Sequence, residues 1–443
     1  MAQTAMIKGH ALLRWFSLQS GAKRYRIQDE VVRPYEIICE RSREFEELIL
    51  ILFLIDKYYS GEDQLSFGTQ HKNLFEETRD IIEDLYYFLT RRKLSIRFVQ
   101  VQRQVFQQQQ IVPGGEVRRR GAPCLFSGGL DSASGALVLT KRRLFPTLTH
   151  TATGNIVYGQ ARRLKEHFML RSLPMIMTDM RLHTRARAAD SSQIKTRGLL
   201  FLSNALSIAS SMRSNQVYMA ENGPLMVNPR VSSLSDPTRN THPYLVATLE
   251  RIYNHITQSK VRIVPMFKDN TKAEIVAQVL HDDIIDRTWS CFRIQGQSRM
   301  CGLCFACFVR RLSVLAVDYE EPLATYERDM FLGEKKDLSS VSRIDLDILH
   351  DTFLFLEKLL LDNRSIRDNM FMIPDGFFND EVELLRNFAL DIFLGVRNYL
   401  KRSGTKTMGL LGRFAMKALK RVSKSYLKQR EDRLSSIADL AQK

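Results

Sequence analysis

The stretch CLFSGGLDSASGAL, residues 124–137, constrains the fold of this chain more than any other part of the sequence. Three apolar-leaning residues run into two glycines, and an aspartate and a run of small residues follow. Such a segment is typical of a buried strand, a tight loop and the start of a helix. Glycines let the backbone approach an anion and expose N–H groups, and the helix dipole favours negative charge there. The stretch therefore predicts an anion site at the carboxyl end of a strand.

Strands and helices are expected to alternate after this loop. The predicted strands cover residues 124–126, 154–160, 173–179 and 215–223, and the predicted helices cover 133–143, 161–168 and 197–212. This alternation predicts an α/β fold with a doubly wound parallel sheet and right-handed crossovers. In such sheets ligands bind outside the carboxyl ends of the strands, which is where the glycine loop falls.

The flanks differ from this central pattern. Before it, helices are expected at 40–60 and 72–93, and alternating residues at 95–110 predict a strand pair or an edge strand before a Pro- and Gly-rich linker at 113–123. After Asp318 the pattern is helical, most clearly at 346–363 and 380–400. A chain of 443 residues exceeds the size at which one core stops growing, about 250 to 300 residues. We therefore expect three parts: a mainly helical extension at 1–120, an α/β domain at 121–315, and a basic helical extension at 316–443.

Composition and charge narrow the class of protein. The longest apolar run, Leu48–Ile55, is far shorter than the roughly 20 residues that cross a bilayer. The first residues lack the pattern of a secretory signal, so a cytoplasmic protein without membrane contact is expected. The net charge of +16 attracts phosphate-rich partners, and residues 396–430 contain lysines and arginines but no acidic residue. A solvated face is the favoured interpretation of this stretch, and a docking surface for an acidic partner, nucleic acid included, is the alternative.

Four of the six cysteines are clustered near residue 300. Cys291, Cys301, Cys304 and Cys307 form the spacing C-x9-C-x2-C-x2-C, and Gly302 allows a tight turn between two of them. Four thiolates in this spacing predict a closed, structural Zn²⁺ site. An iron–sulfur cluster and a metal-free group of buried cysteines are the alternatives.

The residues of the glycine loop point to a nucleotide polyphosphate. Ser127 and Ser132 add hydroxyl donors to the backbone N–H groups of the loop. A carboxylate beside phosphates would repel them, so Asp131 makes sense as a ligand of Mg²⁺. The loop lacks the lysine of a Walker A motif, which excludes an ordinary P-loop.

The sequence SGGLDS resembles the PP-loop of N-type ATP pyrophosphatases, which share an adenine nucleotide alpha hydrolase-like fold. Further elements resemble the QueC family, 7-cyano-7-deazaguanine synthase, over residues 120–315. They are SGGLDSAS at 127–134, Tyr158-Gly159-Gln160, Arg197-Gly198, Lys272-Ala273-Glu274-Ile275, Thr288-Trp289-Ser290-Cys291 and Cys301-Gly302-Leu303-Cys304-Phe305-Ala306-Cys307.

The resemblance implies that ATP is cleaved to AMP and pyrophosphate while a carboxylate on a 7-deazaguanine is adenylated, for amide and then nitrile formation. It assigns phosphate contacts to Ser127, Gly128, Gly129, Leu130 and Ser132, Mg²⁺ to Asp131, and charge stabilisation to Lys272 and Arg197. It also assigns a base or a substrate contact to Tyr158 and Gln160. Solvated helix positions for Lys272 and Arg197, and a packing turn for Tyr158 and Gln160, are the alternatives from the residues alone.

The chain departs from the family between Glu221 and Leu245, where the segment that frames the deazaguanine is replaced by another sequence. With its long flanks, the chain resembles the QueC-like proteins of bacterial anti-phage operons of the Qat type, which implies a protein partner from the same operon. Candidate replacements for the substrate frame are Glu221, Asn222, Arg239, Thr241 and His242. The alternative functions are a PP-loop enzyme that modifies RNA and a non-catalytic nucleotide sensor in a defence complex.

Overall fold

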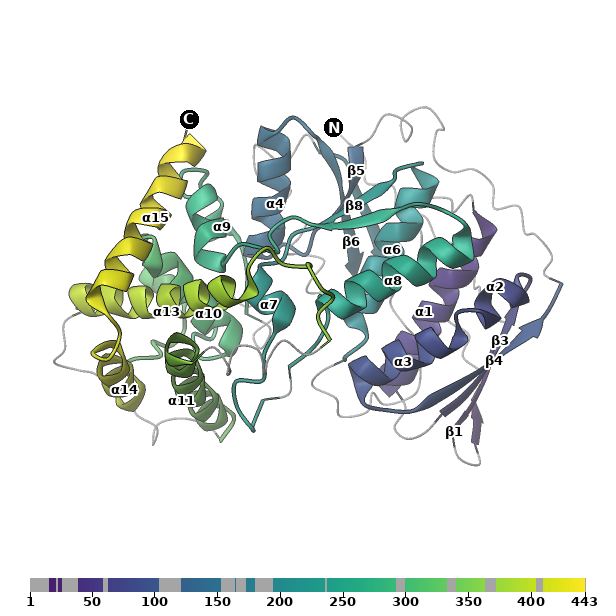
Figure 1. Ribbon diagram of the computed structural model, residues 1–443, viewed down its shortest axis with the longest axis horizontal. Helices are drawn as coiled ribbons and strands as arrows, with labels where there is room; N and C mark the ends of the chain where they lie inside the picture. Colours follow the sequence, from purple (N-terminus) through teal and green to yellow (C-terminus); the bar gives the residue numbers. More distant parts are fainter. Residues whose placement is uncertain are drawn as a thin grey trace.

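The computed structural model describes residues 16–20, 23–25, 39–58, 63–102, 121–152, 164, 173–179, 194–235, 237–291, 299–332, 340–362, 372–403 and 409–442. The molecule is elongated in Figure 1, with N-terminal elements at the right, a sheet in the middle and C-terminal helices at the left. The order of these parts in space follows their order along the chain.

The central sheet has five strands, which are all parallel. They are β5 (Gly121–Leu125), β6 (Pro146–Ala152), β7 (Met175–Asp179), β8 (Gln216–Met219) and β9 (Arg262–Pro265). Their order across the sheet is β7-β6-β5-β8-β9, so the direction of the connections reverses between β5 and β8. This confirms the predicted parallel α/β sheet and places a switch point beside the first strand.

Helices cover both faces of this sheet. On one side, α4 (Leu130–Lys141) contacts β6 and its apolar residues share a cluster with Leu148. On the other side, α6 (Arg197–Ser211) and α8 (Pro243–Thr257) share a separate cluster with Val217 and Ile263. Two short helices, α7 (Gly223–Val227) and α9 (Lys272–Gln278), follow β8 and β9. Since each helix follows a parallel strand, α4, α6, α7 and α9 all begin near the carboxyl edge of the sheet.

The second and fifth strands differ from the sequence expectation. The second strand is β6 at 146–152, upstream of the expected strand at 154–160, which lies outside the described residues, as does the helix expected at 161–168 apart from Leu164. The sequence PTLTHTA does not indicate a buried strand, because its threonines are polar. They are buried, and Thr149 donates to the carbonyl of Cys124 while Thr151 accepts from Asn204. Strand β9 is only four residues long and was not expected.

The N-terminal part contains a sheet where we expected mainly helix with a strand pair. Its strands are β1 (Phe16–Ser20), β2 (Lys23–Tyr25), β3 (Asp63–Thr69) and β4 (Leu94–Gln100), in the order β2-β1-β3-β4. Strand β4 forms one edge and pairs in parallel with β3. The helix expected at 72–93 is divided into α2 (Lys72–Glu76) and α3 (Arg79–Thr90), because Thr78 leaves helical geometry between them.

Helix α1 (Glu40–Tyr58) joins the N-terminal part to the central sheet. Its residues from Leu48 to Ile55 are all buried, and the helix packs against α6 and α8. A helical segment that is apolar on every side is stable when other elements cover all of its faces. Here residues of the N-terminal sheet and of α6 and α8 share its cluster. The cluster around it spans both parts of the chain, so the linker near residue 120 does not separate two independent cores.

The C-terminal part is helical, as expected. It contains α11 (Ser340–Leu361), α13 (Glu381–Ser403), α14 (Leu410–Leu419) and α15 (Lys424–Gln442), which pack on α10 (Phe305–Ala316) at the end of the α/β part. Their apolar residues form one cluster that also includes Ala273 of α9. Helix α13 packs against α10 where Gly395 meets the backbone of Leu312. Within the described residues, none of the helices is both long and apolar enough to cross a membrane.

The basic stretch at 396–430 finds its acidic partners elsewhere in the chain. The pairs are Arg397 with Glu431, Arg402 with Asp318, Arg421 with Glu357, and Arg430 with Asp391. The stretch therefore carries less unpaired positive charge than its sequence implies.

The contact at Gly395 gives a stability prediction. A Cβ there would lie 2.2 Å from the carbonyl oxygen of Leu312, so Gly395→Ala must push α13 away from α10. We expect a loss of about 1 to 3 kcal/mol in the free energy of unfolding, measured by urea denaturation. Asn387→Ala, on the same helix with its amide bonded to Glu383, is the control, expected within about 0.5 kcal/mol of wild type. Equal stability of both variants would contradict the predicted close packing.

Candidate functional site

The glycine loop follows β5 and is held by its own serines. Gly128 has a φ of 82°, in the region that favours glycine, and Gly129 is the residue before the first turn of α4. The amide of Gly129 donates to Ser127 Oγ at 3.2 Å, and the hydroxyls of Ser127 and Ser132 lie 3.1 Å apart. Ser132 Oγ also donates to the carbonyl of Gly129 at 3.0 Å. The loop is thus preformed, before any ligand binds, at a helix N-terminus. This geometry favours the binding of an anion.

Ser127 and Leu130, two residues of the glycine loop, differ in their exposure to solvent. Ser127 is exposed, so its hydroxyl is accessible from solvent. Leu130 is 1% exposed and packs against Val276, Ile285 and Val314. The side chain of Leu130 therefore anchors the loop, and its contribution to a ligand is limited to its backbone N–H.

Asp131 lies at the centre of a buried polar cluster. Its carboxylate forms an ion pair with Lys272, and both side chains are 8% exposed. Its other oxygen accepts from Asn222 Nδ2 at 2.7 Å, and the same amide donates to Glu221 Oε1 at 3.2 Å. These residues follow β5, β8 and β9, so the sheet brings them together at the switch point.

The pKa values of the two carboxyls move in opposite directions. Burial favours a higher pKa for Asp131, but the Lys272 ammonium and the hydrogen bonds of its neighbours lower it overall. Burial, followed by the negative charge of Asp131, raises the pKa of Glu221 well above its usual range. The pair therefore holds one stable negative charge and a second carboxyl that resists ionisation in this state.

Lys272 is the first residue of α9, and the start of that helix is closely defined. Thr271 Oγ1 accepts from the amide of Glu274, and Glu274 Oε2 accepts from the amide of Thr271 at 3.0 Å. This capping box fixes the backbone on both sides of Lys272. The alternative of a solvated lysine is wrong, because Lys272 is buried and its ammonium contacts Asp131. Its role toward a nucleotide stays a prediction.

Arg197 begins α6, on the same edge of the sheet, with an exposed side chain. The preceding Thr196 gives its amide and its hydroxyl to Asp56 of α1, each at 2.9 Å. Gly198 is required by packing, since a Cβ there would lie 1.8 Å from the carbonyl oxygen of Asn240. No ion pair of Arg197 is found among the residues that the structure describes. Tyr158 and Gln160 lie outside the described residues.

The candidate substrate frame divides into two groups. Glu221 and Asn222 belong to the cluster around Asp131. Arg239 instead donates to the carbonyl of Phe88 in α3 and lies 4.7 Å above its ring, and the His242 ring lies 5.0 Å from the same ring. Arg239 and His242 thus join the N-terminal part to the start of α8, while Thr241 lies half-buried beside them.

The four predicted cysteines come together. Their sulfur atoms all lie within 4.8 Å of one another. Sulfur pairs are separated by 3.9 Å for Cys301–Cys307, 4.0 Å for Cys291–Cys304 and 3.5 Å for Cys304–Cys307. A tetrahedron with Zn–S bonds of about 2.3 Å has edges of about 3.8 Å, so this donor set fits Zn²⁺.

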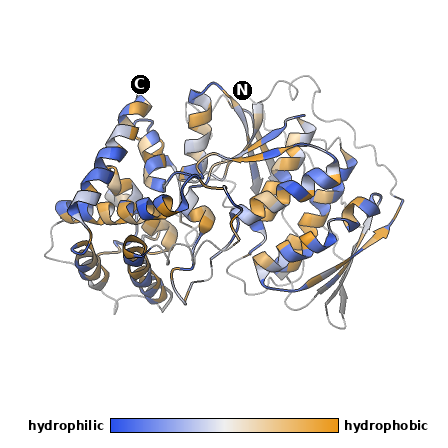
Figure 2. Cartoon of the chain, in the orientation of Figure 1, coloured by the Kyte–Doolittle hydropathy of each residue, from blue (hydrophilic) through white to orange (hydrophobic). Residues whose placement is uncertain are grey.

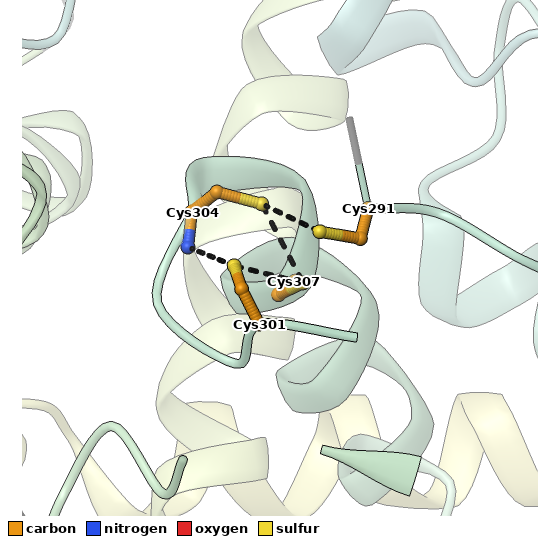
Figure 3. Close-up of side chains that lie close together, drawn as sticks. All are labelled: Cys291, Cys301, Cys304 and Cys307. Carbon is orange, nitrogen blue, oxygen red and sulfur yellow. Dashed lines mark hydrogen bonds between the residues drawn. The ribbon is translucent and has the colours of Figure 1, made fainter. Parts of the chain in front are cut away.

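Figure 3 shows the cysteines on two segments: Cys301, Cys304 and Cys307 lie on one turn and helix start, and Cys291 faces them from another segment. The amides of Leu303 and Cys304 point to Cys301 Sγ at 3.4 and 3.3 Å. Gly302 has a φ of 78° and packs against the backbone of Arg328, so a side chain would not fit. All four positions of a tetrahedral ion would be filled by sulfur, which leaves no position for a catalytic water.

The cysteine cluster is connected to the glycine loop through Trp289. The Trp289 amide donates to the carbonyl of Gly128 at 3.3 Å, and its indole N–H donates to the carbonyl of Cys291 at 2.8 Å. A buried arginine of α10, Arg310, braces the same segment, donating to Thr288 at 2.7 Å and to Glu321 at 2.8 Å. Sequence reasoning missed Arg310, and no local signal in an apolar helix distinguishes it from a surface arginine.

Comparison with known proteins agrees with these features. Residues 160–317 match the model of a family described as queuosine biosynthesis protein QueC. This part of the chain is QueC-like. The matched range includes Arg197, Lys272 and the cysteine cluster, whereas the glycine loop lies before it. A search of curated proteins gave no significant match. The match supports an ATP-using protein of the PP-loop class, and the parallel sheet and the four cysteines are consistent with it.

The cysteine cluster predicts the metal content. We expect about one Zn²⁺ per purified chain by plasma mass spectrometry, because the four thiolates form a closed tetrahedron. Cys304→Ser should lose the metal and lower the melting temperature, since the segment from Thr288 to Cys291 loses its tether. Cys39→Ser, outside the cluster, should retain both the metal and the stability. Iron in place of zinc, or a metal-free stable wild type, would contradict the structural zinc site.

His242 predicts an acid-sensitive stability. Its Nδ1 accepts from the amide of Tyr244 at the start of α8, and burial together with Arg239 lowers its pKa to about 4. His242 is therefore protonated below pH 6.5 in the unfolded chain, but only below about pH 4 in the folded chain. The stabilisation is complete above pH 6.5 and is lost as pH falls through this window, by about 1 kcal/mol near pH 5.5.

The variant that tests this is His242→Asn, which retains a capping acceptor but does not titrate. In this variant the imidazole ring no longer packs on Phe88, which lowers the free energy of unfolding by a similar amount at every pH. The observable is therefore the difference between wild type and variant, measured by urea unfolding at pH 7.5 and 5.5. It should shrink at the lower pH by about 1 kcal/mol. A difference independent of pH would show that His242 is not held neutral.

Proposed function

We propose that this protein is an ATP-dependent, QueC-like ligase that cleaves ATP to AMP and pyrophosphate and adenylates the carboxylate of a 7-deazaguanine. A carboxylate oxygen forms a bond to the α-phosphorus, and the bond from that phosphorus to the bridging oxygen breaks, so that pyrophosphate leaves. An amine nitrogen then attacks the acyl carbon and AMP departs with the bonding pair. The observation that carries the proposal is a preformed glycine loop joined to the buried Asp131–Lys272 pair, in a chain with a QueC-like domain.

The residues of the loop have distinct roles in this proposal. The N–H groups at the start of α4 and the exposed hydroxyl of Ser127 bind phosphate oxygens, and Ser132 keeps the loop in shape. Lys272 contacts Asp131 in the first turn of α4, and in this proposal it offsets charge that develops on the phosphates. Arg197, at the start of α6 on the same edge of the sheet, is the second cation in this proposal. The carboxylate of Asp131 holds Lys272 in position until nucleotide binds.

Mg²⁺ fits the donor set at this site. Asp131 and Glu221 provide two neighbouring carboxyls. Burial and the charge of Asp131 raise the pKa of Glu221, and a divalent cation between the two carboxyls would offset both effects and allow both to ionise. When bound, the ion supplies charge neutralisation for the leaving pyrophosphate. Asp131 and Glu221 would hold it, with Asn222 orienting both carboxyls through its amide.

The substrate and its acceptor follow from the departures from QueC. Glu221 lies at the switch point, where a small ligand beside ATP would bind, and we propose that it contacts the deazapurine. Asn222, which is fully buried, orients Glu221 from behind. The acceptor is ammonia or an amine of a partner protein, in the manner of the anti-phage proteins of the Qat type. In this proposal residues 121–315 carry the chemistry, and residues 1–120 and 316–443 support it and contact the partner.

The two alternative functions have less support. Four arginines of the basic stretch at 396–430 form ion pairs with acidic residues, which reduces the positive charge that the stretch offers to a nucleic acid. Cys124 is fully buried and burial raises its pKa to about 12, so it is unsuited to act as the nucleophile of a thiolating enzyme. A nucleotide sensor without chemistry is expected to lose loop residues first, whereas Asp131, Ser127 and Ser132 are all present here.

The test is a product assay. We expect purified protein with ATP, Mg²⁺ and 7-carboxy-7-deazaguanine to form AMP and pyrophosphate, measured by chromatography. Asp131→Asn should lower the rate by about 10²- to 10³-fold, because it removes the charge that holds Lys272 and the ion. Lys141→Ala, at the far end of the same helix, is the control and should match wild type.

Two results would overturn parts of the proposal. Nucleotide binding without AMP, with the deazapurine and with co-expressed operon proteins, would favour the sensor. AMP formed only with RNA would favour the RNA-modifying alternative.

A further inference from the structure

Helix α15 places a buried arginine beside the start of α9. Most of α15 is hydrophilic in Figure 2, yet the Arg430 side chain is 2% exposed. Its guanidinium donates through Nε and Nη2 to the two oxygens of Asp391, at 2.6 and 2.9 Å. Nη1 donates to Glu274 Oε1 at 2.7 Å, and Nη2 also reaches Thr271 Oγ1 at 3.0 Å. One side chain thus binds α13 and both capping residues of α9.

The chemistry of this cluster requires an arginine. Two buried carboxylates repel each other, and burial raises the pKa of Asp391 while the Arg430 guanidinium opposes that rise. A planar fork satisfies four oxygens at once, whereas an ammonium is a point charge that cannot span them. The cluster therefore requires the planar shape of an arginine side chain as well as its positive charge.

The cluster determines where Lys272 lies. Glu274 gives one oxygen to Arg430 and the other to the amide of Thr271, and Thr271 gives its hydroxyl to Asp391. Lys272 is the residue between the two caps, and its ammonium contacts Asp131. A positive side chain at the positive end of a helix is unfavourable by itself. The caps and Asp131 offset that cost and set its direction.

We propose that Arg430 is a positioning residue, which makes the C-terminal helix a part of the nucleotide site by fixing the start of α9 and so the direction of Lys272. This inference rests on the proposed function for its catalytic meaning. It assigns to the C-terminal extension a role that the QueC-like match, which ends at residue 317, does not include.

The first test measures the backbone around Lys272 without any nucleotide. Arg430→Lys keeps the buried charge but loses the fork, and hydrogen–deuterium exchange of residues 268–279 is read by mass spectrometry. We expect exchange to rise by about tenfold, since the caps loosen. Arg421→Lys is the matched control, because Arg421 pairs with Glu357 on the surface. Unchanged exchange in Arg430→Lys overturns the inference, whether or not nucleotide binds.

The second test asks whether Arg430 acts through Lys272. Affinity for α,β-methylene-ATP with Mg²⁺ is measured by calorimetry for Arg430→Lys, Lys272→Ala and the double variant. We expect each single variant to bind about tenfold more weakly, and the double variant to match Lys272→Ala within about twofold. Effects that multiply would mean that Arg430 only stabilises the fold, which overturns the inference.

The two proposals fail in different ways. If the wild-type protein binds no α,β-methylene-ATP, the proposed function is overturned. Raised exchange in Arg430→Lys would still support the inference that Arg430 fixes the backbone around Lys272. Normal nucleotide binding with normal exchange in Arg430→Lys leaves the proposed function standing and overturns the role of Arg430.

Discussion

The buried ion pair between Lys272 and Asp131 is the contact on which the rest of the site depends. It joins the start of α9 to the start of α4, two helices that follow different strands of the central sheet. Both helix N-termini carry partial positive charge, so the carboxylate of Asp131 offsets two dipoles as well as an ammonium. Removal of either partner would leave a buried charge unpaired, at a cost of about 3 to 5 kcal/mol. The pair thus holds the switch point together while keeping a cation beside the glycine loop.

The cysteine cluster supports the same loop from another direction. Trp289 contacts the loop through its backbone and the Cys291 carbonyl through its indole, so a metal at the cluster would stiffen the segment that touches Gly128. Arg310 reinforces this segment from α10. A closed thiolate site suits this role, because a fully coordinated zinc ion provides rigidity and takes no part in chemistry.

The two extensions act on the central sheet in similar ways. From the N-terminal part, Asp56 caps the helix that begins with Arg197. From the C-terminal part, Arg430 binds the caps on both sides of Lys272. Each extension also shares a hydrophobic cluster with helices of the sheet. The start of each helix that carries a candidate cation is therefore defined by a residue from outside the QueC-like part.

The sequence by itself determined the features that depend on neighbouring residues. Cysteine spacing predicted the cluster, and the glycines and serines from Ser127 to Ser132 predicted a strand, loop and helix start, because each motif is local. Strand β6 was missed, because its sequence looks polar, while Thr149 and Thr151 are hydrogen-bonded to partners elsewhere in the chain. Only the tertiary structure decided that Arg239 and His242 pack on Phe88, that four arginines of the basic stretch are ion-paired, and that Arg310 and Arg430 are buried. A charged side chain has the same sequence signature on a surface and in a core, and only the distant carboxylates that the fold brings to it make burial stable.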